Sequence, residues 1–302
     1  MQFINLLSAR NYSQRTIRSY SSELRFLFSY YNNLNPQELT QDEICQYILY
    51  LRQVYNSGYT KIRMLVFSVK FLFNNIFNRP YDLPSDLYPR KEYKLPLVMT
   101  QDEVSLLLSV TENLKSRTIL ELYYSTGMRC DELRHLKITD IDSANMQIRI
   151  NHGKGRRQRY VLLSKRVLDL LRMYYLEYRP KDWLFNGKTE GKQMSLNALH
   201  WIMRNAVKKA GFNKQYSIHT LRHSFATHML DMGNDLHTIK ELLGHAKIET
   251  TMIYLHLQTH KRAALISPID NLFCPVYKNK VKPSKLKTNE YSSANNKNIQ
   301  EK

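Results

Sequence analysis

Residues 146–163 read MQIRINHGKGRRQRYVLL, and this stretch decides the fold class. Apolar residues at positions 146, 148 and 150 alternate with polar ones, a period of two that is typical of a half-buried β-strand. A second β-type run occupies residues 160–163, and Gly153-Lys154-Gly155 between the two runs has the composition of a turn. The stretch therefore predicts a β-hairpin with a basic tip.

The sequence on both sides of this hairpin has helical periodicity instead. Apolar residues recur at spacings of three and four in six segments, which are residues 17–31, 44–51, 62–77, 201–206, 221–230 and 239–243. Two capping boxes, Thr40 with Glu43 and Thr100 with Glu103, mark helix starts. The chain is predicted to be mainly α with a small β-sheet, an α+β protein without internal repeats.

A proline-rich stretch divides the chain. Four of the nine prolines lie close together, at Pro80, Pro84, Pro89 and Pro96. Proline lacks a backbone N–H and favours extended geometry in the residue before it, so the stretch interrupts the helices. A chain of 302 residues also exceeds the size that one hydrophobic core usually organises. We predict a helical domain at 1–79, a linker at 80–96 and a second domain, with the sheet, at 97–275.

The charge of the chain calls for an explanation. There are 45 Lys and Arg against 26 Asp and Glu, a formal charge of +19 at pH 7. A polyanionic partner would offset the self-repulsion of this charge, although a proteome that is generally rich in lysine is an alternative. The excess is spread along the whole chain, as a protein that encircles a duplex requires. It includes residues 276–302, which are rich in Lys, Asn and Ser and are predicted to form a disordered basic tail.

Cysteine usage and hydropathy indicate the compartment. Cys45, Cys130 and Cys274 are widely spaced and odd in number, so they suggest neither a disulfide framework nor a paired metal-ligand motif. No apolar run approaches the length of about 20 residues that crosses a bilayer, and the first residues lack the pattern of a signal peptide. We expect a cytoplasmic protein.

Short segments that combine Arg, His, Lys and Tyr with small residues are candidates for chemistry. They are Thr126–Leu133 (TGMRCDEL), Gly153–Gly155 (GKG), His219–His223 (HTLRH) and Leu243–His245 (LGH), followed by Tyr254. Gly127 ends the preceding helix, so Arg129 is expected in the first turn of a new helix, where free backbone amides favour an anion such as phosphate. Taken alone, Arg129 fits an ordinary exposed arginine better than a phosphate ligand.

The histidines have similar alternatives. His219 and Arg222 are three residues apart and share a helix face, so Arg222 could oppose Arg129 across a phosphate. His219, His223 and His228 could in principle bind a metal, but the cysteine or carboxylate that usually completes such a site is missing. We expect His223 and His228 to be structural. His245 follows Gly244, a residue expected at a helix C-terminus with positive φ.

In combination, these segments resemble the phage-integrase family of tyrosine recombinases, with a layout close to that of the Xer-type and integron-type enzymes. The family order is an Arg in T-G-x-R-x-x-E-L, a Lys in a β-hairpin, H-x-L-R-H, L-G-H and then a Tyr. The resemblance covers residues 12–270 and assigns six residues to the active site, which are Arg129, Lys154, His219, Arg222, His245 and Tyr254. Glu132 is expected to support Arg129. Cys130 after the arginine and Leu255 after the tyrosine are small departures from the pattern.

The resemblance implies an N-terminal helical core-binding domain of the SAM-like type and a C-terminal catalytic domain, which together form a C-shaped clamp on double-stranded DNA. It implies a site-specific recombinase or integrase that acts through a 3′-phosphotyrosyl intermediate at Tyr254 and exchanges strands via a Holliday junction. The assembly would be a homo-tetramer, or a hetero-tetramer with a paralogous recombinase, held by residues 261–273. Neither a metal cofactor nor ATP is expected, and the enzyme would be nucleoid-associated.

The residue types suit this chemistry. A phenol has a pKa of about 10, so the Tyr254 hydroxyl needs activation before it attacks phosphorus. Arg129 and Arg222 would hold the non-bridging oxygens, and His245 would add a donor. His219 is then the candidate base for the tyrosine proton, and Lys154 is the candidate acid for the departing 5′-oxygen.

Two other functions are compatible with the same fold. A type IB-like topoisomerase would nick and reseal DNA without strand exchange. A non-catalytic DNA-binding protein would keep the fold, but six intact active-site residues argue against it. Integration, excision, inversion, transposition on a mobile genetic element and chromosome dimer resolution all fit the motifs equally.

Overall fold

The computed structural model describes residues 2–80, 95–151, 158–189 and 191–257. The chain folds as two compact units, Met1–Pro96 and Leu97–Lys302. The predicted fold class is confirmed, because the described elements are mainly helices with one small antiparallel sheet. None of the described helices combines the length and the apolar character that a membrane crossing requires.

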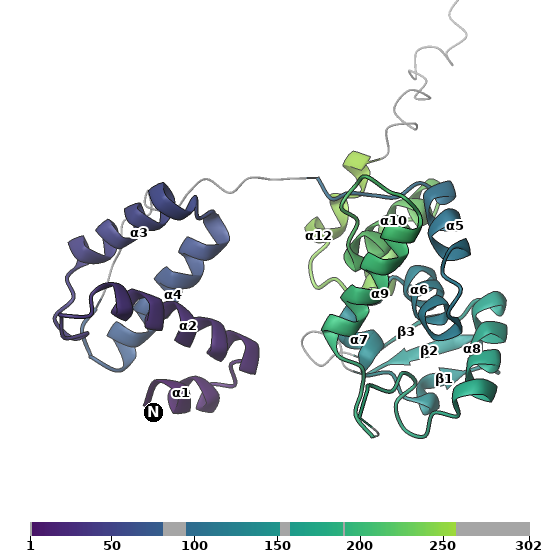
Figure 1. The fold of residues 1–302 in the computed structure, drawn as a ribbon, viewed down its shortest axis with the longest axis horizontal. Helices are drawn as coiled ribbons and strands as arrows, with labels where there is room; N and C mark the ends of the chain where they lie inside the picture. Colours follow the sequence, from purple (N-terminus) through teal and green to yellow (C-terminus); the bar gives the residue numbers. More distant parts are fainter. Residues whose placement is uncertain (1, 81–94, 152–157, 190, 258–302) are drawn as a thin grey trace, which may run out of the picture. The chain divides into compact units, whose positions relative to one another are not determined.

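The first unit is a bundle of short helices (Figure 1). Its helices are α1 (Gln2–Ala9), α2 (Gln14–Tyr30), α3 (Gln41–Tyr55) and α4 (Tyr59–Asn75). The predicted capping box of Thr40 and Glu43 is present at the start of α3, and Ser13 caps α2. Helix α1 was not predicted from the periodicity. It forms because Leu7 is buried in a small cluster with residues of α2 and α4.

The second unit contains a three-stranded antiparallel sheet. Its strands are β1 (Ile141–Asp142), β2 (Gln147–Ile150) and β3 (Arg159–Leu162), in the order β1-β2-β3. The predicted hairpin strands are confirmed, with Ile148 opposite Val161, and both of these side chains are buried. The predicted turn at Gly153-Lys154-Gly155 lies outside the described residues.

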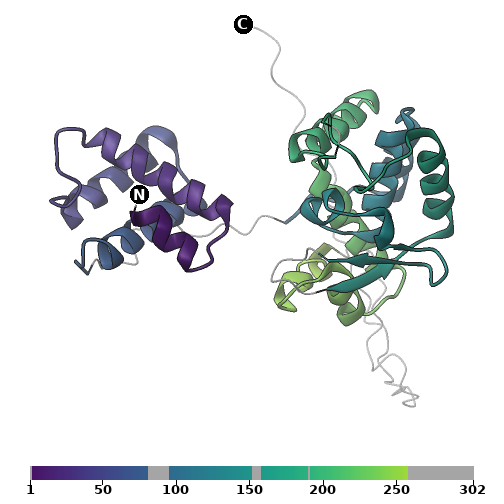
Figure 2. The same ribbon diagram turned by 90° about the horizontal axis from the view of Figure 1, so that it is seen from below.

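Helices make up most of the rest of the second unit. They are α5 (Gln101–Ser109), α6 (Leu114–Thr126), α7 (Cys130–Arg134), α8 (Lys165–Tyr178), α9 (Leu196–Lys209), α10 (Ile218–Asp231), α11 (Leu236–Leu243) and α12 (Glu249–Met252), with short 3₁₀ turns at η2 (Ile138–Asp140) and η3 (Leu255–Leu257). Helices α6 and α11 both contact β3 (Figures 1 and 2). Helix α10 contacts α6, α9 and α11, so it lies at the centre of the helical layer and most of its residues are buried.

Candidate active site

Arg129 is positioned by a glycine turn between two helices. Helix α6 ends at Gly127, whose φ of +58° is a left-handed conformation that glycine adopts without strain. A Cβ at this position would lie 2.3 Å from a ring carbon of Phe225, so the turn also allows α10 to approach closely. Arg129 follows as the N-cap of α7, as the sequence predicted to within one residue.

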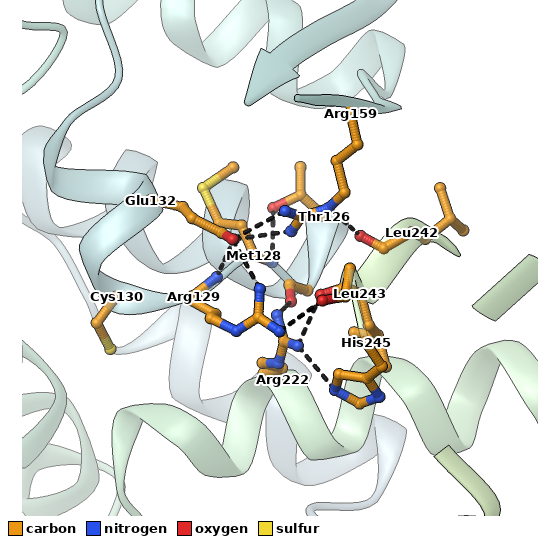
Figure 3. Close-up of polar contacts among 12 residues, drawn as sticks. Thr126, Met128, Arg129, Cys130, Glu132, Arg159, Arg222, Leu242, Leu243 and His245 are labelled. Carbon is orange, nitrogen blue, oxygen red and sulfur yellow. Dashed lines mark hydrogen bonds and ion pairs between the residues drawn. The ribbon is translucent and has the colours of Figure 1, made fainter. Parts of the chain in front are cut away.

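The guanidinium of Arg129 is held by two acceptors (Figure 3). Its Nη1 donates to Glu132 Oε1 at 2.9 Å, and its Nη2 donates to the Gly244 carbonyl at 2.7 Å. The backbone N–H of Arg129 donates to Glu132 Oε2 at 2.7 Å. Glu132 therefore fixes both the side chain and the main chain of Arg129.

Glu132 has a second arginine partner that sequence reasoning missed. Arg159 on β3 donates to both carboxylate oxygens, at 2.8 and 2.7 Å, and its Nε donates to the Leu242 carbonyl at 2.9 Å. Burial alone would raise the pKa of Glu132, but the hydrogen bonds and charge of Arg159, together with Arg129, lower it overall. The available signal was the basic run Arg156-Arg157-Gln158-Arg159, which was interpreted only as part of a basic tip.

Arg222 lies on α10 and is only 5% exposed. Its Nη1 donates to the Gly127 carbonyl, and its Nη2 donates to the Leu243 carbonyl at 2.8 Å. These carbonyls belong to the C-terminal ends of α6 and α11, where the helix dipole favours a cation. Burial, followed by the charge of Arg129, lowers the pKa of Arg222 to about 10, so the side chain stays charged at neutral pH.

His245 lies directly after the left-handed Gly244, which has the positive φ (+63°) that the sequence predicted. Its Nε2 is 3.0 Å from Arg222 Nη2, and its Nδ1 is 2.9 Å from Thr251 Oγ1. A guanidinium can only donate, so Nε2 accepts and the Nδ1–H donates to the threonine. Burial and then the charges of Arg222 and Arg129 lower the pKa of His245 to about 3, which keeps the ring neutral.

Tyr254 is 1% exposed and packs in a cluster that includes Phe225 and Leu243. Its hydroxyl lies 3.0 Å from His223 Nδ1, in a hydrogen bond that the sequence did not anticipate. Burial raises the pKa of Tyr254. Burial and the charges of His219 and Arg222 lower the pKa of His223 to about 4. The signal for this contact was the second histidine of H-x-L-R-H, which was assigned a structural role.

His219 lies on α10, one turn before His223. Its Nδ1 is 3.5 Å from the Tyr123 hydroxyl, and its Nε2 is 3.9 Å from Cys130 Sγ. Burial and then the charge of Arg222 lower the pKa of His219. The described residues include no group of three or more His, Cys, Asp or Glu side chains arranged to hold a metal ion.

The structure thus brings together two hydrogen-bonded groups, Arg129 with Glu132 and Arg159, and Arg222 with His245. The three arginines of this cluster donate to the successive carbonyls of Leu242, Leu243 and Gly244. Tyr254 is connected through His223, the neighbour of Arg222 in sequence. Lys154 lies outside the described residues. The cluster combines three guanidinium groups with one carboxylate, so its net positive charge complements a bound phosphodiester.

Comparisons with known proteins agree with this chemistry. Residues 97–261 match the phage integrase family, and residues 1–83 match the phage integrase N-terminal SAM-like domain. The chain is 32% identical to the tyrosine recombinase XerD of Listeria monocytogenes, over 83% of this chain and 91% of the relative. It is also 32% identical to the tyrosine recombinase XerA of Pyrococcus horikoshii, over 87% and 91%.

A solved structure shares the fold. The XerH site-specific recombinase, in a post-cleavage complex with a palindromic difH substrate, superposes with a TM-score of 0.70 over 85% of this chain and 81% of that chain, at 23% identity. The family predicted from the order of the motifs is confirmed by the family models and by the relatives above 30% identity. The chain belongs to the phage integrase family of tyrosine recombinases, enzymes that cleave and rejoin DNA at specific recombination sites.

Proposed function

We propose that Tyr254 is the nucleophile that forms a 3′-phosphotyrosyl bond, and that Arg129 and Arg222 bind the scissile phosphate. His245, which accepts from Arg222 at Nε2 without DNA, adds a donor when it exchanges this contact for a phosphate oxygen and is protonated at Nε2. The observation that carries this proposal is the hydrogen-bonded contact between Arg222 and His245, beside an Arg129 guanidinium that is anchored on Glu132 and Gly244. Donors that are fixed before the substrate arrives stabilise a transition state without reorganising during the reaction.

The anchoring explains how the charge is used. Helix-end carbonyls and Glu132 occupy some of the five N–H donors of each guanidinium and leave others for phosphoryl oxygens. The pentavalent transition state carries more negative charge on these oxygens than the ground state does. The arginines therefore bind the transition state more strongly than the substrate, which is the requirement for rate acceleration.

The steps conserve atoms and charge. The Tyr254 hydroxyl gives its proton to a histidine base, its oxygen bonds to phosphorus, and the bond from phosphorus to the 5′-oxygen breaks. Lys154 donates the proton that the departing 5′-oxygen takes up. The order of the motifs nominates His219 as this base, and its lowered pKa favours the neutral ring that the role requires. A 5′-hydroxyl from another strand then attacks the phosphotyrosine in the reverse sequence and releases Tyr254.

The wider assembly follows from the same assignment. The domain at 1–79 and the catalytic domain at 97–275 hold opposite faces of the duplex as a C-shaped clamp, with residues 80–96 as the linker between them. Residues 261–273 pack on a neighbouring subunit in a tetramer, in which strands are exchanged through a Holliday junction. The basic tail at 276–302 adds non-specific attraction to DNA. The enzyme is cytoplasmic and associated with the nucleoid.

A suicide substrate tests the nucleophile. The DNA on either side of the gene is first searched for inverted repeats, and a duplex that carries such a repeat is nicked near the cleavage point. After cleavage the short fragment with the free 5′-hydroxyl diffuses away, which traps the covalent adduct. The unaltered enzyme is expected to accumulate adduct, and Tyr254→Phe is expected to form none. An adduct that persists in Tyr254→Phe would refute the assignment. Relaxation by a monomer of supercoiled DNA without such a site would favour a topoisomerase instead.

A further inference from the structure

We infer that His223 is a catalytic residue, the base that takes the proton of Tyr254 during cleavage and returns it during rejoining. The inference rests on the proposed role of Tyr254 as the nucleophile. It assigns the proton transfer to a residue that the sequence analysis expected to be structural. His219, which the order of the motifs nominates as the base, contacts Tyr123 and Cys130 instead of Tyr254.

The geometry is that of a nucleophile and its base. The Tyr254 hydroxyl and His223 Nδ1 are 3.0 Å apart, within the range for direct proton transfer. The two rings are 5.8 Å apart between centroids and inclined by 47°. Because Tyr254 is 1% exposed, bulk water has little access to its hydroxyl. Among the described residues, His223 is the hydrogen-bond partner of this hydroxyl.

The contacts of His219 are different. Its Nδ1 faces the Tyr123 hydroxyl and its Nε2 faces the Cys130 thiol, so both ring nitrogens have other neighbours. No hydrogen bond joins His219 to Tyr254 among the described residues. His219 and His223 lie one turn apart on α10, and the ring of His223 is the one that contacts the phenol.

Electrostatics couples the transfer to substrate binding. Without DNA, burial and the nearby Arg222 hold the pKa of His223 at about 4 and thereby disfavour the imidazolium. A phosphate bound by Arg129 and Arg222 offsets the arginine charge and makes imidazolium formation easier. As the bond from oxygen to phosphorus forms, negative charge passes from the phenol to the phosphoryl oxygens, beside the imidazolium that has just formed.

The proton balance is complete. In cleavage, the proton moves from Tyr254 to His223 Nδ1 while Lys154 protonates the 5′-oxygen. In rejoining, the incoming 5′-hydroxyl gives its proton to Lys154, the bond from tyrosine to phosphorus breaks, and the phenolate recovers its proton from His223. The role requires the tautomer of neutral His223 that carries its proton on Nε2.

The same helix contains a matched control. His228 also lies on α10, and its Nδ1 is 2.8 Å from the Tyr124 hydroxyl. The pair is a tyrosine–histidine contact of the same kind, but it includes no residue of the arginine cluster. Asparagine at either position keeps an oxygen acceptor near the place of Nδ1 and cannot take up a proton at neutral pH.

The experiment measures single-turnover adduct formation on the nicked duplex. His223→Asn is expected to slow it by about 100-fold or more, while His228→Asn stays within about twofold of the unaltered enzyme. DNA binding by mobility shift should be retained in both variants. An unchanged or faster rate in His223→Asn would overturn the inference, because the histidine would then only hold Tyr254 in place or restrain it. If the unaltered enzyme forms no adduct at Tyr254, the proposed function fails instead.

A second measurement leaves position 223 untouched. Site-specific 3,5-difluorotyrosine at 254 makes the phenol more acidic. With His223 acting as base, the adduct rate of the otherwise unaltered enzyme should change little, whereas His223→Asn should recover much of its loss. If adduct formation by the difluorotyrosine enzyme with His223 intact becomes faster as more of the phenol ionises, the inference is contradicted. This measurement does not require the His223→Asn variant to fold.

Discussion

Arg159 on β3 donates two hydrogen bonds, of 2.8 and 2.7 Å, to the buried carboxylate of Glu132, 27 residues earlier in the chain. Glu132 in turn fixes Arg129, so a strand residue outside the six family positions helps to hold the Arg129 guanidinium, for which we propose phosphate binding. The pair links the sheet to the start of α7. Its importance for catalysis can be measured.

Replacing Arg159 by lysine keeps the charge and removes the paired geometry. We expect Arg159→Lys to slow adduct formation by about 10- to 100-fold, because Glu132 and then Arg129 would shift. Arg149→Lys is the control, since Arg149 on β2 is more exposed and its longer hydrogen bonds, of 3.3 and 3.4 Å, reach only one oxygen of Asp140. Equal rates for the two variants would show that Arg159 does not position the site.

Removing the charge of Glu132 should affect both stability and activity. Glu132→Gln leaves Arg129 and Arg159 without their shared counter-ion, and we expect a loss of about 3 kcal/mol in the free energy of unfolding, measured in urea. Glu121→Gln is the matched control, because Glu121 is also buried and bonded to two arginines, Arg117 and Arg166. It should lose stability but keep its cleavage rate. Normal cleavage in Glu132→Gln would contradict the positioning role.

Gly244 has a left-handed backbone conformation and lies close to the Arg159 guanidinium, so a side chain at this position is disfavoured for two reasons. A Cβ there would lie 2.8 Å from Arg159 Nη1, and the φ of +63° adds a cost of about 1 kcal/mol for alanine. Gly233→Ala is the control, because Gly233 also has a positive φ but open space within 4 Å of its Cβ position. Both variants should lower the melting temperature, whereas only Gly244→Ala should slow adduct formation. Similar cleavage rates would refute the prediction.

The buried histidine His245 should make folding sensitive to acid. The pKa of His245 is about 3 in the folded state and about 6.5 in the unfolded chain, so below pH 6.5 the unfolded state binds a proton that the folded state does not. The free energy of unfolding is therefore not reduced by His245 above pH 6.5, and it falls as the pH drops from 6.5 towards 3. Urea unfolding between pH 6 and 4 should show a slope that His245→Asn reduces by about 1.4 kcal/mol per pH unit. An identical slope in the variant would disprove this.

Only a small part of the +19 charge should act on the scissile phosphate. Arg222→Lys keeps one positive charge but loses the planar fork. We expect the variant to lose most of its cleavage activity while the salt dependence of DNA binding changes by less than about one unit of slope. Binding titrations at several salt concentrations, together with the suicide substrate, measure the two effects separately. A large loss of affinity with intact chemistry would contradict the division of charge.

Local patterns predicted the local structure well. The capping boxes at Thr40 and Thr100 both form, and the alternation around Ile148 gave the hairpin strands. These features depend on residues a few positions apart, so a sequence pattern records them. Helix α1 was missed because its stability comes from the packing of Leu7 on other helices.

The sequence motifs predicted some residues of the site but not the contacts between them. The order of the family motifs identified Arg129, Arg222 and His245. It did not identify the main-chain carbonyls that accept hydrogen bonds from the two arginines. Arg159 reaches the Leu242 carbonyl 83 residues away, and His223 reaches Tyr254 31 residues away. Such contacts arise when β3, α10 and α11 pack together, and no local period encodes them.

The acceptors at Gly127, Leu243 and Gly244 are main-chain carbonyls, and every residue type offers the same oxygen. Substitution of the side chain at Leu243 therefore leaves its acceptor in place as long as the helix ends where it does. The positions of the Arg129 and Arg222 guanidinium groups are therefore set by the path of the backbone, while surface side chains of the same helices can diverge. The geometry of the arginine cluster can in this way persist in chains whose side chains differ at most other positions of these helices.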